Sequence, residues 1–267
     1  MAIATLGVSI LFVYGLIIGS FLNALIWRIK QRRSIIKGRS MCPNCKHKLV
    51  ALDLIPVISW MLLRGKCRYC QKAISYQYPI IELLTAILFA LSFLILRPNG
   101  LYSWIDFGIW LYILASLICL GAYDLKWMIL PNVILVPAII ISALLLVFQL
   151  AILKAPLSVA TGPIIAAVFI AIVFSALAML AGGRLMGFGD VKLVFLMGLL
   201  LGVKKLFLAL FLAFNLAAIV GVGLILLKRK TRKDHIPFGP FLTGATIFAF
   251  LVGTPIIDWY LKALTEV

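Results

Sequence analysis

Long apolar stretches, separated by short polar segments, make up most of this chain. The first runs from Ile3 to Trp27. It is long enough to cross a bilayer, because a helix rises about 1.5 Å per residue and the hydrocarbon core is about 30 Å thick. A basic segment follows it without a small-residue cleavage site, so we predict a retained first helix rather than a signal peptide. Further apolar stretches cover 79–96, 104–122, 132–153, 157–181, 191–203, 206–227 and 237–258.

The stretch from Val191 to Leu227 is too long for a single crossing. Lys204 and Lys205 interrupt it, so two crossings are expected there, the first of them short. Because only helices and closed barrels satisfy every backbone polar group in lipid, the pattern predicts an all-α integral membrane protein with about eight transmembrane helices. The expected organisation is a first transmembrane helix over 1–27, a cytoplasmic loop domain over 28–78 and a polytopic helical core over 79–267.

Composition supports a membrane protein. Hydrophobic residues make up 64% of the 267 residues and charged residues 12%, with a mean hydropathy of +1.18, which excludes a soluble globular protein. The net charge of +17 would suit nucleic-acid binding, but the lysines and arginines gather in a few loops, as the positive-inside rule describes. We therefore expect membrane lipid as a partner and no nucleic acid. By helix parity the cytoplasmic segments are 28–78, 123–131, 182–190 and 228–236.

Four cysteines lie in the loop domain as two C-x-x-C pairs. Cys42 and Cys45 form the first pair, Cys67 and Cys70 the second, and 21 residues separate the pairs, just beyond the usual interval of about 15–20 for a four-cysteine zinc site. Four thiolates can hold one tetrahedral Zn²⁺, and a reducing cytoplasm disfavours structural disulfides. We predict a zinc-ribbon-like domain with a structural metal, because so small a loop has little core of its own.

Two other interpretations explain the paired spacing of the cysteines less well than zinc does. A redox pair needs only a single C-x-x-C, and cysteines buried for packing do not follow this paired spacing. His47 could replace one thiolate, although its basic neighbours favour a surface position. Cys119 stands alone in an apolar stretch, where core packing is expected.

Two of the eight acidic residues stand out by their position. Asp190 follows Gly187 and Gly189 at the start of an apolar stretch, and Asp124 follows the end of another. By parity both lie near the cytoplasmic edge of the bilayer. An aspartate at the centre of a membrane helix costs about 2.5–3.5 kcal/mol, so such residues are functional candidates. The alternatives are an N-cap for Asp190 and a helix-end ion pair with Lys126 for Asp124.

Two neighbouring carboxylates cannot both ionise readily, so the pair shares a proton. The ionised member can activate a water while the protonated member polarises a carbonyl, which is peptide hydrolysis without a metal or a covalent intermediate. Gly187 and Gly189 would let a substrate strand approach closely, and Lys192 completes the expected active-site loop. The alternative is a transporter or ion-conducting protein that uses Asp124 and Asp190 as a proton relay. A membrane scaffold with a zinc interaction module would leave the glycine-flanked aspartate unexplained.

Short motifs are distributed from the first apolar stretch to the last. They are 19–23 (GSFLN), 53–60 (DLIPVISW), 64–70 (RGKCRYC), 74–79 (ISYQYP) with Glu82, 130–132 (LPN) after Asp124, 187–193 (GFGDVKL) and 236–241 (IPFGPF). With these motifs the chain resembles the type IV prepilin leader peptidases, which are membrane aspartyl proteases with a Gly-x-Gly-Asp motif. No departure occurs at either aspartate or at any cysteine of the four.

The resemblance implies an endopeptidase that removes the basic leader from type IV prepilins or pseudopilins at the cytoplasmic face of the bacterial inner membrane. It implies Asp124 and Asp190 as the catalytic pair, and pilin or pseudopilin precursors of a type IV pilus or type II secretion system as partners. Many similar proteins with the cysteine loop also methylate the new N-terminal amine from S-adenosylmethionine. No Rossmann glycine fingerprint is present, so methylation is expected from the resemblance alone.

Overall fold

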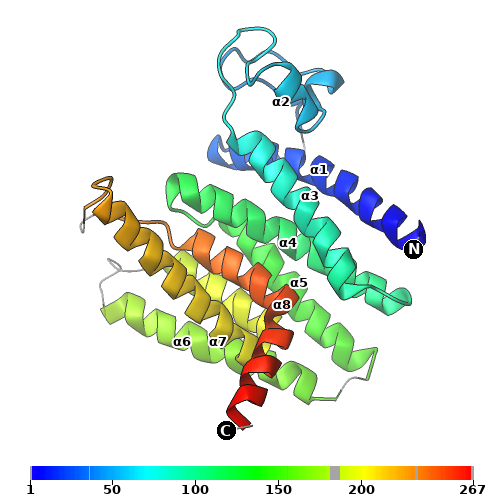
Figure 1. Ribbon diagram of the computed structural model, residues 1–267, viewed down its shortest axis with the longest axis vertical. Helices are drawn as coiled ribbons and strands as arrows, with labels where there is room; N and C mark the ends of the chain where they lie inside the picture. Colours follow the sequence, from blue (N-terminus) through cyan, green and yellow to red (C-terminus); the bar gives the residue numbers. More distant parts are fainter. Residues whose placement is uncertain (1, 36, 155, 181–186, 232–233, 266–267) are drawn as a thin grey trace. The chain divides into compact units, whose positions relative to one another are not determined.

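The chain folds into helices. The computed structural model describes residues 2–35, 37–154, 156–180, 187–231 and 234–265 (Figure 1). Across these residues the only strand-like features are two isolated bridges. Seven of the described helices are long and apolar enough to cross a membrane, which confirms the predicted all-α membrane architecture. The elements are α1 (Ala2–Lys30), η1 (Ala51–Leu54), α2 (Ile58–Leu62), α3 (Gln77–Leu96), α4 (Leu101–Trp127), α5 (Asn132–Ala151), α6 (Ser158–Leu180), α7 (Phe188–Leu226) and α8 (Gly239–Thr265).

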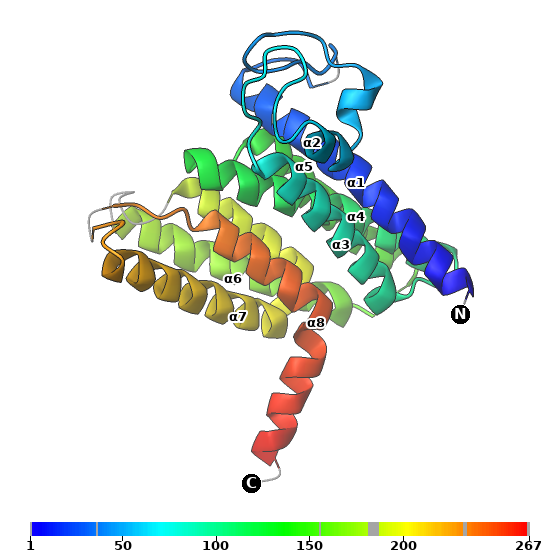
Figure 2. The same cartoon turned by 45° about the horizontal axis from the view of Figure 1, so that its top comes forward.

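Residues 1–107 form one compact unit, in which α1 and α3 pack side by side (Figures 1 and 2). Two glycines allow their backbones to approach. A Cβ on Gly15 would lie 2.6 Å from Cα of Ala86, and a Cβ on Gly19 would lie 2.6 Å from Cα of Glu82. Small residues four positions apart are a common helix contact in lipid. Gly19 follows Gly15 along α1, whereas its partner Glu82 precedes Ala86 along α3. The two helices are therefore antiparallel, and the cysteine loop leaves and re-enters at one end of the pair.

Within the second unit, residues 108–267, α7 changes direction at Gly202. This glycine has φ 63° and ψ −178°, a conformation that is essentially confined to glycine. Before the break, Gly198 packs on the backbone of Ala167 in α6. After it, the rings of Phe214 and Phe174 lie 6.3 Å apart. At the break itself, a Cβ on Gly202 would lie 3.8 Å from Cγ of Pro163, near the start of α6. The first segment of α7 is therefore antiparallel to α6, and the second is parallel to it.

The two segments of α7 account for the expected number of crossings. At about 1.5 Å per residue, its 39 residues are too long for one passage through the bilayer. The interruption predicted at Lys204 and Lys205 occurs slightly earlier, because Gly202 can adopt a backbone conformation that a lysine cannot. Counted as two segments, α7 brings the seven long helices to the eight crossings read from the apolar pattern.

The remaining contacts of the second unit bring the ends of four helices together. α4 packs antiparallel to α8, with the rings of Trp110 and Phe250 stacked at 3.7 Å, and with Gly121 against Thr243. The end of α4 and the starts of α5, α7 and α8 therefore lie at the same end of this unit. For the residues described, this agrees with the parity argument that placed 123–131, 182–190 and 228–236 on one side; 182–186, 232 and 233 lie outside the described residues.

Candidate active site and metal centre

Asp124 is held in the last turn of α4 by the start of α8. Its carboxylate is buried, with the residue 5% exposed, and its Oδ2 accepts a hydrogen bond of 2.9 Å from the backbone N–H of Gly239. A Cβ at position 239 would lie only 2.6 Å from that oxygen, so a glycine is needed for the contact. No ion pair joins Asp124 to Lys126, both of which the structure describes; the ammonium of Lys126 lies over the ring of Trp127, 5.7 Å from its centroid.

Asp190 lies in the first turn of α7. The N-cap of this helix is Gly187, and the N–H of Asp190 donates to its C=O at 3.0 Å. The idea that Asp190 is itself the N-cap is therefore wrong, although a carboxylate in the first turn is stabilised by the helix dipole. Gly189 lies against Leu130, where a Cβ would be 3.1 Å from the leucine Cβ. Gly189 thus lets the start of α7 approach the segment before α5.

Both aspartates line one open cavity of about 680 Å³. A space of this size is within the range of ligand-binding pockets and can accept a short extended peptide. One part of its wall is apolar and another carries charged and amide groups. Its lining residues are Asp124, Met128, Ile129, Leu130, Asn132, Gly187, Gly189, Asp190, Lys192, His235, Ile236, Pro237 and Phe238.

Lys192 connects two walls of this cavity. Its ammonium donates a hydrogen bond of 3.0 Å to Oδ1 of Asn132, the first residue of α5. The predicted active-site loop of Gly187, Gly189 and Lys192 is therefore next to both aspartates, and Lys192 fixes α7 to α5. Chemically, the arrangement places two carboxylates in the lining of one open cavity.

Several residues at or beside the cavity were given no role by the sequence, although the motifs 130–132 and 236–241 contain three of them. Gly239 holds the carboxylate of Asp124, and Asn132 receives Lys192. His235 and Phe238 come from the segment before α8. The signal for this segment was the motif at 236–241, but nothing in the sequence paired it with Asp124.

Comparison with known proteins decides the family. Residues 13–96 match the bacterial peptidase A24 N-terminal domain, and residues 111–222 match the type IV leader peptidase family. The chain is 34% identical to a protein named prepilin leader peptidase/N-methyltransferase from Aeromonas salmonicida (strain A449), over 96% of this chain and 94% of the relative. The chain belongs to the type IV leader peptidase family.

Other relatives carry the same name. One from Bacillus subtilis (strain 168) is 35% identical over 95% of this chain and 98% of its own length. One from Neisseria gonorrhoeae is 30% identical over 93% of each. No solved structure matches the chain. The resemblance read from the motifs is thus confirmed over nearly the whole chain.

The loop also carries a candidate metal centre. Two knuckles of one backbone design present the cysteines: the N–H of Lys46 donates to the C=O of Cys42 at 2.9 Å, and the N–H of Gln71 donates to that of Cys67 at 3.0 Å. Lys46 and Gln71 both adopt left-handed angles, with φ of 61° and 56°. Each C-x-x-C pair therefore closes with the same turn, which aims its two thiols at one point.

The four Sγ atoms of Cys42, Cys45, Cys67 and Cys70 lie within 4.8 Å of one another, and those of Cys42 and Cys70 are 4.0 Å apart. A tetrahedral Zn²⁺ with bonds of about 2.3 Å needs separations of about 3.8 Å, so the set fits a metal such as zinc with small adjustments. All four thiols are free, and 4.0 Å is about twice the length of a disulfide bond. Four thiolates leave no open position, which suits a structural metal.

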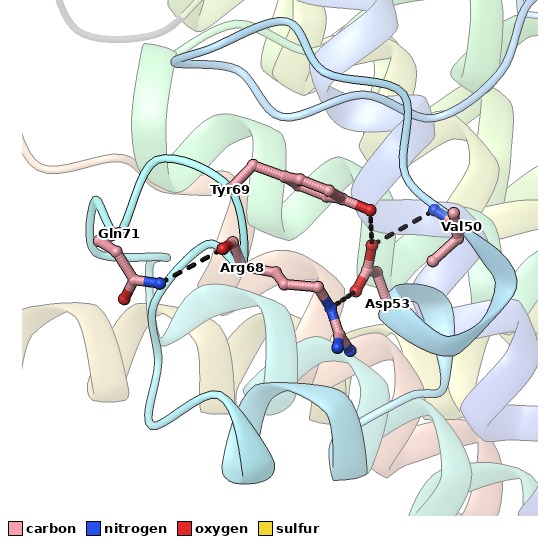
Figure 3. A network of polar contacts seen from close by, with 5 residues as sticks. All are labelled: Val50, Asp53, Arg68, Tyr69 and Gln71. Atoms are coloured by element: carbon pink, nitrogen blue, oxygen red, sulfur yellow. Dashed lines mark hydrogen bonds and ion pairs between the residues drawn. The ribbon is translucent and has the colours of Figure 1, made fainter.

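Asp53, the only acidic residue of the loop, joins the segment between the knuckles to the second knuckle (Figure 3). Its Oδ1 accepts from Nε of Arg68 at 2.7 Å, and its Oδ2 accepts from the hydroxyl of Tyr69 at 3.2 Å and the N–H of Val50 at 3.3 Å. Burial would raise the pKa of Asp53, but these donors outweigh it and lower the pKa. His47 stacks on Tyr69, with ring centroids 3.6 Å apart, so it supports the knuckle instead of joining the sulfur cluster.

Proposed function

We propose that this chain is a membrane-embedded aspartyl endopeptidase that cleaves the leader peptide from type IV prepilins or pseudopilins. The observation that carries the proposal is that Asp124 and Asp190, from two different helices, line one open cavity. Membership of the leader peptidase family and the names of the relatives support the reaction and the substrate class. They give no support to a transporter that uses the aspartates as a proton relay.

In this reaction the aspartates share one proton. The ionised carboxylate takes a proton from the attacking water, the protonated one donates a hydrogen bond to the scissile carbonyl, and the tetrahedral intermediate collapses when the amine leaves with a proton. Burial and the hydrogen bond from Gly239 fix Asp124, while the first turn of α7 presents Asp190. Gly187, where an added Cβ would meet no atom closer than 3.9 Å, leaves room for the substrate backbone.

The substrate is expected to reach the cavity from the membrane. Its apolar helix would lie in the bilayer beside the enzyme and provide most of the affinity. The bond between this helix and the leader would then meet the cavity at the membrane edge. The distribution of basic loops supports a cytoplasmic location for this edge, and hence an inner-membrane enzyme whose cysteine loop, residues 28–78, faces the cytoplasm while 1–27 and 79–267 provide the membrane helices.

Two further parts of the proposal concern cofactors. The tetrad of Cys42, Cys45, Cys67 and Cys70 would hold a structural Zn²⁺ and so contribute to folding of the loop. The relatives' name includes N-methyltransferase, which supports methylation of the new N-terminus from S-adenosylmethionine as a second activity.

The peptidase proposal is tested by cleavage of a prepilin in detergent. Asp124→Asn and Asp190→Asn are compared with Asp258→Asn, which makes the same chemical change in α8 away from the cavity lining. We expect cleavage to be lost in the first two variants and kept in the third, with all three folded. Cleavage at the wild-type rate by either cavity variant would exclude that residue from the pair.

A further inference from the structure

The segment 50–62, which contains η1 and α2, connects the two cysteine knuckles. We propose that this segment lies in the membrane interface and inserts its apolar side chains among the lipids. This part of the loop domain would then neither span the membrane nor lie free in solution. This inference does not depend on the proposed peptidase activity.

The segment exposes large apolar side chains. Leu52 is 64% exposed, Ile58 55%, Met61 64% and Leu62 78%. They occur close together in the sequence, on two short helical turns. A cluster of this kind is unusual on a surface that faces water and marks a contact with a partner or a membrane.

A buried carboxylate fixes the depth of the segment. The N–H of Val57 donates a hydrogen bond of 2.7 Å to Oε2 of Glu82, a residue that is 5% exposed. Glu82 is in the second turn of α3, which spans Gln77–Leu96. With a rise of about 1.5 Å per residue, it lies about 7.5 Å along the helix from Gln77. Interfacial amphipathic segments are buried by about 5–10 Å, so the depth agrees.

The local backbone directs the apolar side chains outward. Val57 has φ 61° and ψ −51°, an unusual conformation for a β-branched residue, and its hydrogen bond to Glu82 holds this turn at the start of α2. Trp60 points inward: its Nε1 donates to the C=O of Ile74 at 3.3 Å, and its ring fills the space that a Cβ on Gly65 would need. Ile58, Met61 and Leu62 remain outside.

The chemistry of the surroundings favours lipid as the occupant. Exposed basic residues, among them Lys48, Arg64 and Lys66, flank the segment and suit anionic head groups. The helix pair that carries the segment also exposes apolar side chains, with Ile17 55% and Ile80 59% exposed. Insertion of the segment would therefore extend a surface that already faces lipid.

Photo-crosslinking of the full-length protein tests this. A photoreactive amino acid replaces Leu62 in protein reconstituted in nanodiscs of phosphatidylethanolamine and phosphatidylglycerol, and adducts are identified by mass spectrometry. Position Ile17 provides the lipid-facing control and exposed Lys72 the aqueous control. We expect lipid adducts at Leu62 in a yield similar to that at Ile17, and their loss at Lys72. Adducts at Leu62 only with water, with another part of this chain or with a second copy would overturn the proposal.

The role of Glu82 in holding the segment at this depth is tested with the same photoreactive residue at position 62. Glu82→Ala removes the acceptor for Val57, so the lipid adduct at Leu62 should be lost while that at Ile17 is unchanged. Glu82→Gln keeps an acceptor oxygen and should lose less. Unchanged adducts at Leu62 in Glu82→Ala, with labelling at Ile17 intact, would contradict the role of Glu82 in setting the depth.

Discussion

Gly239→Ala tests how the Asp124 carboxylate is positioned. The added Cβ would lie 2.6 Å from Oδ2 and 2.9 Å from Cγ of Asp124. Non-bonded heavy atoms are normally about 3.5 Å apart, so the carboxylate must move by about 1 Å or rotate away. Either change breaks or weakens the 2.9 Å hydrogen bond from the Gly239 N–H.

The expected loss of activity can be worked from these distances. A hydrogen bond to a charged group is worth about 1.5–3 kcal/mol, or about 10- to 150-fold in rate. A misplacement of about 1 Å in a catalytic group costs about 100-fold. We therefore expect kcat/KM for prepilin cleavage to fall about 100-fold. Helix propensity favours alanine over glycine, so the helix itself is not weakened.

Gly244→Ala is the matched control. It makes the same change in α8, at a glycine where an added Cβ meets no atom within 4 Å. Both variants are purified in one detergent, and cleavage of a prepilin and thermal unfolding are measured. Gly244→Ala should cleave at the wild-type rate. If Gly239→Ala retains wild-type activity, or if both variants lose it equally, the positioning role of Gly239 is refuted.

The remaining predictions concern the cavity wall and the cysteine loop. Lys192→Ala and Asn132→Ala should each lower cleavage, and the double variant should be no worse than the single ones, because both remove one contact; additive losses in a double-mutant cycle would contradict this. Asp53 has a lowered pKa, so its contribution to loop stability should be complete above its unfolded pKa of about 3.9 and be lost as the pH falls through the lower folded value. Unfolding followed by tryptophan fluorescence should show this loss of stability at acid pH in the wild type and not in Asp53→Asn. Native mass spectrometry should find one zinc per chain, which is lost in the Cys42→Ser, Cys67→Ser variant; a metal-free reduced wild type would contradict the zinc site.

The apolar pattern predicted the helices well because each crossing needs a minimum length of apolar residues, whatever its neighbours are. The four cysteines and the glycines beside Asp190 could likewise be recognised from the sequence, because their spacing along the chain is itself the signal. The turn in α7 was predicted at Lys204 and Lys205 from their charge. It occurs at Gly202, because only a glycine readily adopts the backbone angles of this turn.

Contacts between distant segments could not be predicted in the same way. The sequence placed Asp124 and Asp190 on one side by parity, but the contact of Gly239 with Asp124 joins residues 115 positions apart. The hydrogen bond between Val57 and Glu82, which we propose holds part of the cysteine loop at the membrane interface, could not be predicted either. Such pairings depend on helix packing, which neither residue's local sequence encodes.

The central claim is that Asp124 and Asp190 act as one hydrolytic pair. Its most direct test is the single-turnover rate of prepilin cleavage by Asp124→Asn, Asp190→Asn and the variant with both changes. Residues that act as a unit are strongly non-additive, so each single variant should lose as much activity as the double one. Retained cleavage in a single variant, or losses that multiply in the double variant, would contradict a shared catalytic role.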